Sequence, residues 1–200
     1  VSPPGGDLSE PVSQAKLRIV KVFWGLDSAL AYKRHFPAIN WLTSYSLYID
    51  SIGSWFNENV DKLWLELRQK LMTLLQEEAE LDEIVKMVGM DALSAPDRLK
   101  MEAARSIRED YLHQNSFHEI DTYTSLKKQD MMMKLVLGFY EQSKEALDNG
   151  ADVEQLIKMP VREAIGRFKY THENQLDGEF ARIKEQLSAD VAKVLSKEEM

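Results

Sequence analysis

Four histidines are the side chains of this sequence best suited to metal or acid–base chemistry: His35, His113, His118 and His172. A zinc protease needs H-E-x-x-H, and neither His-Glu pair, at 118–119 or at 172–173, is followed by the second histidine. A di-iron bundle needs paired E-x-x-H motifs with further glutamates, whereas the nearest match, Asp110 to His113, is single and uses aspartate. We therefore predict no metal site, and expect the histidines to be solvent-exposed or hydrogen-bonded.

The sequence also lacks the loops that hold nucleotide phosphates. Neither G-x-x-x-x-G-K-[ST] nor G-x-G-x-x-G occurs, and the pair at 166–167, Gly-Arg, has no such loop around it. No serine is marked as the nucleophile of a Ser/His/Asp triad either. Nothing in these 200 residues is therefore expected to hold the β- and γ-phosphates of a nucleotide.

Composition limits the classes to which the chain can belong. Its 200 residues, 44% of them hydrophobic, suit one domain with a sizeable core and leave room for a fragment of a neighbour. A net charge of −8, from 25 basic and 33 acidic residues, argues against nonspecific binding to nucleic acid. The absence of cysteine excludes disulfides and thiolate metal sites, and fits a cytosolic chain. No apolar run approaches the roughly 18 residues that span a bilayer, so we expect any membrane role to go through a partner.

Helical periodicity dominates the chain, and the fold class we predict is mainly α. Apolar residues recur at helical spacing over these stretches: 13–32, 60–75, 81–88, 94–111, 118–147, 152–168 with a break at Pro160, and 176–195. The segment 1–12, rich in proline and glycine, is expected to be a loop. We also expect a break over 33–46, where Pro37 disfavours helix, and irregular structure over 45–56.

The stretch 87–123 is the one around which the other elements are organised. Gly89 stands where a helix C-terminus favours a left-handed residue, and Ser94 with Pro96 marks the start of the next helix. That helix has a single apolar face, with an apolar residue every four positions from Leu99 to Tyr111. Roughly eighteen residues make a rod about 27 Å long, which links a tight turn at one end to a polar break at the other.

Two phenylalanines stand in breaks between the predicted helices. Phe36 precedes Pro37, and Phe117 lies in the polar break that follows the rod. Core packing is the commoner role of a phenylalanine, and this reading stays open for both.

Four segments resemble one family of proteins. IVKMVGMDALSAPDRL, at 84–99, is similar to the helix-turn-helix of rotary ATPase catalytic subunits, which carries an acidic loop in F-type enzymes. QNSFHEIDTY, SPPGGDLSEPV and RHFPAINWLTSYSLY resemble the catalytic A subunit of V/A-type ATPases. The resemblance spans nearly the whole chain and implies the C-terminal part of such a subunit. It implies a division into 1–12, a loop that ends the α/β nucleotide-binding domain, and 13–200, a C-terminal α-helical bundle domain.

The resemblance assigns roles to both ends of the rod. Phe36 and Phe117 correspond to the two phenylalanines of the family's adenine pocket, and a flat base can stack on such rings. The turn corresponds to the part that pushes on the rotating central stalk; its residues here are Asp91, Ala92, Leu93, Ser94 and Asp97. Because Ala92, Ala95 and Pro96 replace more acidic positions, packing fits this contact better than a strictly electrostatic push.

The resemblance also implies cofactors and partners that lie outside the chain. The intact subunit would bind ATP or ADP with Mg²⁺ and couple ATP hydrolysis or synthesis to H⁺ or Na⁺ transport. Its phosphate loop and Mg²⁺ ligands would lie upstream, so this chain alone is expected to be inactive. The implied partners are B subunits in an alternating hexameric ring and a central-stalk rotor subunit, with no nucleic acid. The complex would be cytoplasmic and peripheral to the membrane. The alternative is a stand-alone helical protein-interaction module.

Overall fold

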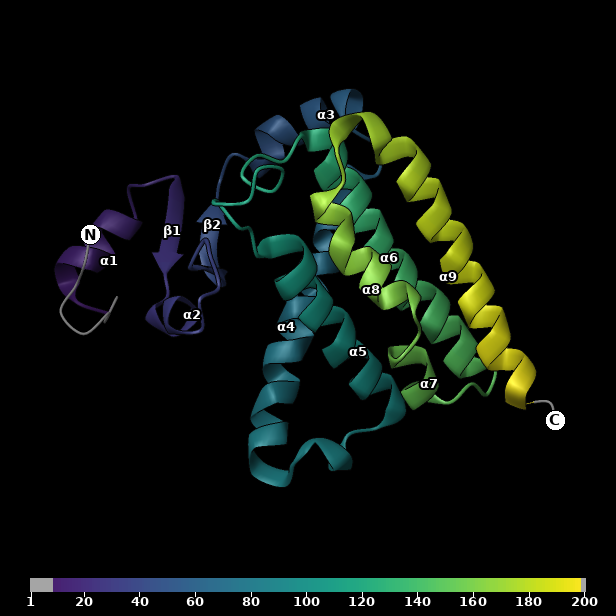
Figure 1. Ribbon diagram of the computed structural model, residues 1–200. Helices are drawn as coiled ribbons and strands as arrows, with labels where there is room; N and C mark the ends of the chain where they lie inside the picture. The colour runs from purple at the N-terminus through teal and green to yellow at the C-terminus, as the bar shows by residue number, and fades with distance from the viewer. Residues whose placement is uncertain (1–8, 199–200) are drawn as a thin grey trace.

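The N-terminal part of the chain is built on two antiparallel strands. The computed structural model describes residues 9–198, in which α1 (Pro11–Leu17) precedes β1 (Val22–Leu26), α2 (Ser28–Tyr32) and β2 (Ile39–Ser46). The carboxylate of Asp27 caps α2 by accepting the backbone N–H of Ala29 at 2.8 Å. The register pairs Val22 with Ser46 and Leu26 with Ile39, and it shifts between Phe23 and Gly25. Figure 1 shows this strand pair beside the helices.

The predicted helix over 13–32 is therefore wrong, and the predicted break over 33–46 is confined to residues 33–38, because 39–46 form β2. The run VFWGL combines β-branched and aromatic residues with a glycine, which favours a strand over a helix. Its spacing imitates a helical face, but Trp24 and Leu26 are 69% and 83% exposed instead of lining a core. The partner strand lies about twenty residues further on, so local periodicity does not reveal the pairing.

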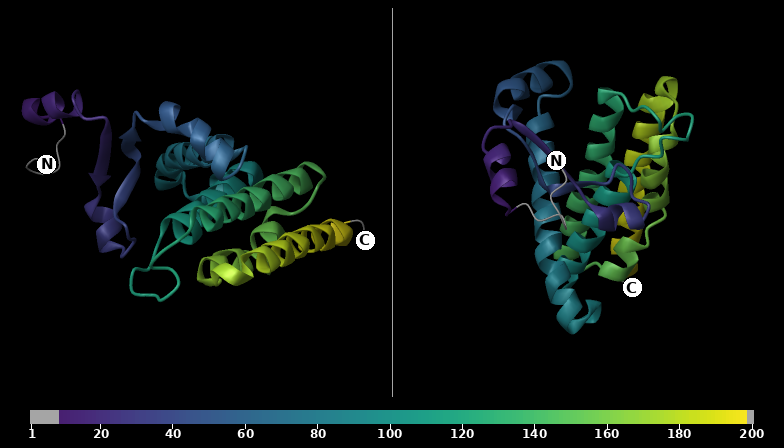
Figure 2. Two further views of the ribbon diagram at one scale, coloured as in Figure 1. Left: turned by 90° about the horizontal axis from the view of Figure 1, so that it is seen from above. Right: turned by 90° about the vertical axis from the view of Figure 1, so that its left-hand side faces the viewer.

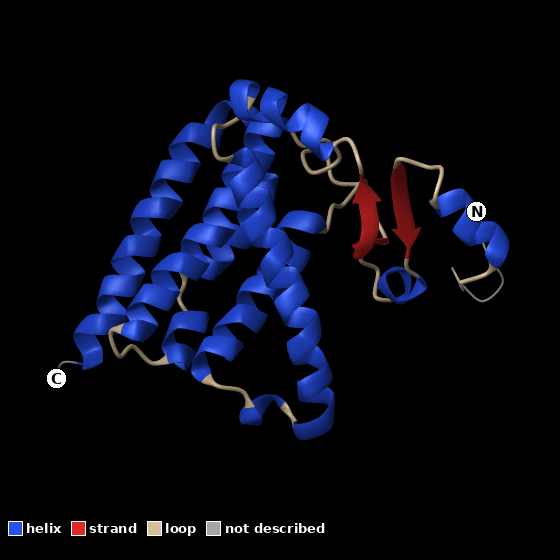
Figure 3. Ribbon diagram, turned by 180° about the vertical axis from the view of Figure 1, so that it is seen from behind, coloured by secondary structure: helices blue, strands red, loops and turns tan. Residues whose placement is uncertain are grey.

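The rest of the chain is helical, which confirms the mainly α fold class. Its long helices are α3 (Ile49–Asn59), α4 (Trp64–Val88), α5 (Ala95–Ser106), α6 (Leu126–Asp148) and α9 (Leu176–Glu198). Shorter pieces join them: η2 (Met90–Ala92), the π-helix η3 (Ile107–Leu112), α7 (Val153–Ile157), α8 (Val161–Arg167), η4 (Phe168–Tyr170) and η5 (Glu173–Gln175). Figure 3 shows that the two strands lie at one side of this helical part.

The core of the helical part surrounds α6. Side chains of α4, α5 and α9 pack against it. Core side chains less than 5% exposed include Leu135 and Phe139 of α6 itself, together with Leu75, Leu99, Ile183 and Leu187. The α4–α5 hairpin, which we call the helical hairpin, extends from this core toward its free turn (Figure 1). Seen from above, the strand pair lies to one side of the long helices (Figure 2, left).

Local signals placed several helix ends correctly. Ser94 accepts the N–H of Asp97 at 3.3 Å and so caps α5, as predicted. Gly89 follows α4 with a φ of 86°, although its ψ of 163° is extended instead of left-handed helical. The break at Pro160 separates α7 from α8. The stretches 60–75 and 81–88 form one helix, α4, instead of two.

Three other predictions are corrected by the structure. Residues 49–59 form α3 instead of irregular chain, and Phe56 stacks on Trp64 with ring centroids 4.0 Å apart. Gly53 allows this packing, because a Cβ there would lie 2.6 Å from a methyl group of Leu65. The helix expected from 118 begins at Leu126, since residues 118–124 form hydrogen-bonded turns. The predicted loop 1–12 ends at Pro11, where α1 begins, and its residues 1–8 lie outside the described residues.

Candidate functional site

The first part of the site is the Phe36 loop, residues 33–38, between α2 and β2. Phe36 is 50% exposed, so it does not fill a core. Its neighbour His35 donates its backbone N–H to the carbonyl of Leu30 at 2.9 Å. The His35 ring contacts Trp41, with centroids 5.6 Å apart, and His113, 5.2 Å apart. These contacts fix the loop at His35 while the Phe36 ring remains partly free.

The second part is the Phe117 loop, residues 113–125, which joins η3 to α6. Phe117 is 98% exposed, so the core reading does not hold for it either. Asn115 accepts the N–H of Phe117 at 3.0 Å, and the carboxylate of Asp121 accepts the N–H of Asn115 at 2.7 Å. Asp121 is only 2% exposed. A fully exposed ring therefore stands on a turn that is held by the buried carboxylate of Asp121.

The structure joins these two loops. The N–H of Gln114 donates to the carbonyl of Phe36 at 2.8 Å, and its side-chain amide donates to the carbonyl of Asp121 at 2.7 Å. A pocket of about 450 Å³ lies beside this junction, with Pro37, His113, Gln114, Asp121 and Tyr123 among its lining residues. Neither phenylalanine lines the pocket. The hydrogen bonds of Gln114 thus hold the two loops together, and the rings of Phe36 and Phe117 lie outside the pocket.

The two histidines at the junction have lowered pKa values. Burial and the nearby charges of His113, Arg108 and Lys169 lower the pKa of His35 to about 4. Burial and the charge of Lys169 also lower the pKa of His113. Both rings are therefore neutral at neutral pH. His118 fits the expectation of a hydrogen-bonded ring, because its Nδ1 accepts the N–H groups of Ile120 and Asp121 at 3.2 and 3.3 Å.

The free turn of the helical hairpin is the third part, and we call residues 87–97 the hairpin tip. Of the turn residues singled out in the sequence, Asp91, Ala92 and Ser94 are exposed, whereas Leu93 and Asp97 are half-buried. The Asp97 carboxylate accepts the hydroxyl of Ser94 at 2.6 Å.

Sequence reasoning missed the apolar character of the tip. Met87, Val88 and Met90 are 77%, 61% and 45% exposed. The missed signal is that these residues directly flank the helix-ending Gly89, where a buried apolar face cannot continue. Three exposed apolar side chains beside a turn form a surface suited to contact by packing.

A continuous rod of 18 residues, α5 followed by η3, links the hairpin tip to the Phe117 loop. Its predicted apolar face is confirmed: Leu99, Ala103 and Ile107 are at most 1% exposed. The π-helical character shows in the bond from the N–H of His113 to the carbonyl of Arg108, five residues earlier, at 2.9 Å. Short π-helical stretches in helices are frequent at functional sites.

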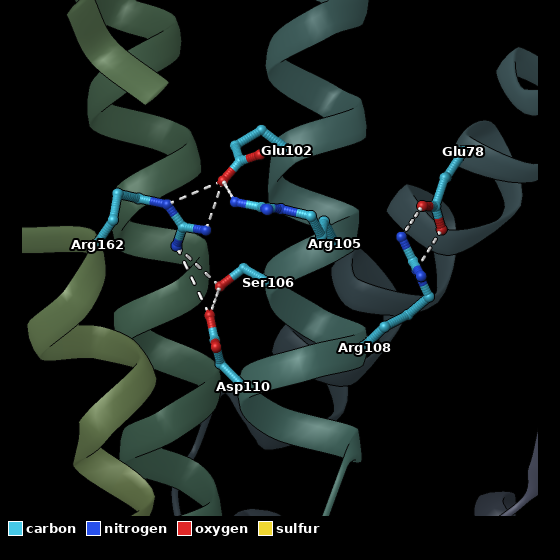
Figure 4. Close-up of polar contacts among 7 residues, drawn as sticks. All are labelled: Glu78, Glu102, Arg105, Ser106, Arg108, Asp110 and Arg162. Carbon is cyan, nitrogen blue, oxygen red and sulfur yellow. Dashed lines mark hydrogen bonds and ion pairs between the residues drawn. The ribbon is translucent and has the colours of Figure 1, made fainter. Parts of the chain in front are cut away.

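Ion pairs hold the rod on both sides (Figure 4). Arg162 of α8 donates to the carboxylate of Glu102 at 2.7 Å and to the hydroxyl of Ser106 at 3.0 Å, and Ser106 in turn donates to Asp110. The Arg162 guanidinium also lies 4.5 Å from the ring centre of Phe139. These contacts connect the middle of the rod to both α8 and α6.

On the other side of the rod, Arg108 pairs with Glu78 of α4 at 2.7 Å (Figure 4). Burial raises the pKa of Glu78, while the charge of Arg108 opposes this shift. Removal of Arg108 would leave a mostly buried carboxylate unpaired. The rod is thus fixed to the bundle near its Phe117 end. At its start, Arg98 pairs with Glu154 of α7, and only the turn that precedes this contact is mostly exposed.

Across residues 9–198, no three or more His, Asp or Glu side chains gather where they would hold a metal ion. Within the same residues, no helix is both long and apolar enough to cross a bilayer.

Comparison with known proteins matches both parts of the chain. Residues 53–157 match the family described as the C-terminal domain of V and A type ATP synthase. Residues 1–46 match the nucleotide-binding domain of the ATP synthase alpha/beta family. The V-type ATP synthase alpha chain of Acetivibrio thermocellus is 63% identical over 198 residues, which are 99% of this chain and 34% of that protein.

Two clostridial proteins are also similar to this chain over nearly its whole length. The V-type ATP synthase alpha chain 1 of Clostridium tetani is 58% identical over 197 residues, 98% of this chain and 33% of that protein. The alpha chain of Clostridium novyi is 58% identical over 199 residues, 99% of this chain and 34% of that protein. The chain thus spans about a third of the length of the relatives it matches.

Proposed function

The chain belongs to the family of C-terminal domains of V- and A-type ATP synthases, and from this premise we propose that it serves a rotary catalytic subunit at two places. One is the adenine side of the nucleotide site, formed by Phe36 and Phe117. The other is the hairpin tip, which contacts a central-stalk rotor subunit. The alternative, a stand-alone helical interaction module, is not favoured, because the matches cover nearly the whole chain.

The observation that carries the nucleotide role is the exposure of two aromatic rings on joined loops. Phe117 is 98% exposed and Phe36 is 50% exposed, while the hydrogen bond from Gln114 to Phe36 ties their loops together. Burial of such rings is strongly favourable, and each offers a face for a flat base. A bound adenine would cover these rings without displacing any core contact.

The intact subunit, in this proposal, couples ATP hydrolysis or synthesis to H⁺ or Na⁺ transport. The phosphate loop and the Mg²⁺ ligands lie outside these 200 residues, so the chain alone binds the adenine side only and is inactive. The partners are B subunits in an alternating hexameric ring and the rotor subunit. The complex is cytoplasmic and reaches the membrane only through its other subunits.

The division of the chain follows from the same proposal. In this proposal, the segment 1–12 is a remnant of the nucleotide-binding domain, and 13–200 is the C-terminal α-helical domain, which includes the strand pair. The match to nucleotide-binding domains extends the similarity as far as residue 46, which includes both strands. The exposed Trp24 and Leu26 of β1 then offer a surface for the remainder of that domain.

The rod provides the mechanical link between the two places. Nucleotide binding stabilises the arrangement of the loops that closes on the base. The difference in nucleotide affinity between the closed and the open arrangement is the free energy that shifts their populations. The rod is fixed near its loop end by Arg108 and in its middle by Arg162, so a rotation of the loops carries the tip with it. The tip would then press its apolar side chains against the rotor.

The test of the nucleotide role is the double substitution Phe36→Ala, Phe117→Ala in the full-length subunit. We expect weaker ATP binding by about a hundredfold, because base stacking on an aromatic ring contributes about 1–3 kcal/mol per base. Trp55→Ala is the matched control, since Trp55 is also 50% exposed but lies on α3. Unchanged ATP affinity in the double variant would count against the proposed function.

A further inference from the structure

A buried lysine, Lys169, contacts the backbone at the start of the Phe117 loop. Lys169 belongs to η4 and is only 6% exposed. Its ammonium group donates to the backbone carbonyl of Glu109 at 2.9 Å and to that of His113 at 3.1 Å. It therefore bridges the last turn of η3 and the first residue of the Phe117 loop.

This position is well suited to fix the end of the rod. The carbonyl groups at the C-terminal end of a helix lack partners within the helix and carry partial negative charge. A cation held there with two hydrogen bonds is stabilised, whereas a buried ammonium without them would be costly. Lys169 thus holds the carbonyl groups at the C-terminal end of the helix in place. This fixes the orientation of Gln114, the residue after His113.

Gln114 is the residue that joins the two loops. Its N–H donates to the carbonyl of Phe36 at 2.8 Å, directly after the carbonyl that Lys169 holds. On the other side of Phe117, the ring of His118 contacts that of Tyr170, with centroids 4.4 Å apart. Residues 169 and 170 of η4 therefore hold the Phe117 loop both before and after its exposed ring.

We propose that Lys169 is a positioning residue for the adenine side of the nucleotide site. It touches no base; it acts through His113 and Gln114, which set the place of Phe36 relative to Phe117. This inference rests on the proposed nucleotide function. Its structural part, that Lys169 fixes the junction of the loops, is testable without nucleotide.

The structural part is tested on the 200-residue chain by amide hydrogen exchange. We expect Lys169→Met to raise the exchange rate of the Gln114 amide and of residues 113–124 by about tenfold, since the substitution removes two hydrogen bonds from a charged group to the backbone. Lys169→Arg should restore most of the protection. Lys158→Met is the matched control, because Lys158 is a lysine of an exposed ion pair, with its side chain 76% exposed. Wild-type exchange in Lys169→Met would overturn the inference.

A second variant keeps this test decisive if Lys169→Met does not fold. Lys169→Gln retains an amide donor for one of the two carbonyls and should give an intermediate exchange rate. Circular dichroism and the melting temperature of each variant establish that the helices remain. Gln114 protection unaltered in a folded Lys169→Gln variant would equally overturn the inference.

The functional part is tested in the full-length subunit with ATP and with inorganic tripolyphosphate. We expect Lys169→Met to raise KM for ATP by about tenfold, with kcat changed less than twofold, and to leave tripolyphosphate binding unaltered, because only the base meets the two rings. Lys169→Arg should recover most of the ATP affinity. A general loss of both ligands would indicate a structural defect and overturn the positioning role.

The double phenylalanine variant separates failure of this inference from failure of the proposed function. If it loses ATP affinity while Lys169→Met does not, the inference fails and the nucleotide function stands. If it retains ATP affinity, the nucleotide function fails, and the adenine role of Lys169 fails with it. Hydrogen exchange then still decides whether Lys169 fixes the loops.

Discussion

The two ends of the rod differ in how firmly they are held. At the Phe117 end, the buried carboxylate of Asp121 and the buried ammonium of Lys169 hold the backbone with hydrogen bonds of 2.7 to 3.1 Å. At the hairpin tip, the turn bonds from Ala92 to Gly89 and from Leu93 to Met90 are 3.4 and 3.2 Å long. Gly89 and Ser94 form shorter bonds of 2.8 and 2.6 Å, but the residues of this turn are mostly exposed.

The difference corresponds to what each end has to do. Stacking on a flat base depends on where a ring is placed, so its loop needs fixed geometry. An apolar contact that moves along a partner needs exposed apolar area but no single orientation, because the hydrophobic effect is non-directional. The same helix thus presents a rigid end and an adaptable end. The predictions below test this contrast, beginning with the change of largest expected effect.

Arg162→Met should cause the largest loss of stability, because it removes the contact that joins the rod to α8. The change removes the buried donor of Glu102 and Ser106 and leaves Glu102 with the more exposed Arg105 at 2.7 Å. Because Arg105 still pairs with Glu102, we expect the lower end of the about 3–5 kcal/mol that loss of one partner of a buried ion pair costs. Urea unfolding measures the effect. Arg167→Met is the control, because Arg167 forms an ion pair of which both side chains are more than 70% exposed. A loss below about 1 kcal/mol would contradict a firmly anchored rod.

Asp121→Ala should cost about 2 kcal/mol and act mainly on the Phe117 loop. The substitution leaves the N–H of Asn115 without its acceptor, and an unsatisfied donor costs about 1–3 kcal/mol. Hydrogen exchange should rise over 113–125 more than over the helical hairpin. Asp91→Ala, at the exposed tip, is the matched control and should change stability by less than about 0.5 kcal/mol. Equal effects of the two substitutions would remove the contrast between the ends.

The His35–His113 contact should make stability depend on pH. The pKa of His35 is about 4 in the folded chain, against an ordinary value of 6.5. As the pH falls, the unfolded chain therefore takes up the proton first. The contribution to stability is complete above pH 6.5 and is lost as the pH falls toward 4. We expect this contribution to the free energy of unfolding to be about 1 kcal/mol, because the His35 ring is in part open to water.

Urea unfolding of the wild-type chain and of His35→Gln, each at pH 7.5 and pH 5, measures this effect. The charged groups near the ring are His113, Arg108 and Lys169, all of which oppose its protonation. The variant should lose part of the pH dependence. The same dependence in both chains would show that other groups, not His35, cause it.

The double substitution Met87→Ser, Met90→Ser should have the smallest effect on stability, within about 0.5 kcal/mol, because Met87 is 77% and Met90 is 45% exposed. In the assembled complex, the same pair of substitutions should reduce ATP-driven ion transport more than ATP hydrolysis. Asp91→Asn is the comparison that separates packing from charge. If Asp91→Asn reduces transport and the serine variant does not, the tip works by charge instead of by apolar contact.

The sequence by itself determined the elements that local interactions specify. The rod follows from the four-residue spacing of Leu99, Ala103 and Ile107, and its start follows from the Ser94 cap. Both phenylalanines stand in breaks, as Pro37 and the polar run around Phe117 indicate. These features depend on residues at most a few positions apart, so they are legible in one sequence.

Only the tertiary structure decided the features that join distant residues. The strands pair across about twenty positions, against the helical spacing of residues 13–32. The turn bonds of His118 and Asp121 override a helical pattern and delay α6 to Leu126. The contact of Lys169 with His113 spans 56 positions, and that of Arg162 with Ser106 spans the same number. Each depends on where the packed core brings two backbones together, and no local pattern carries that information.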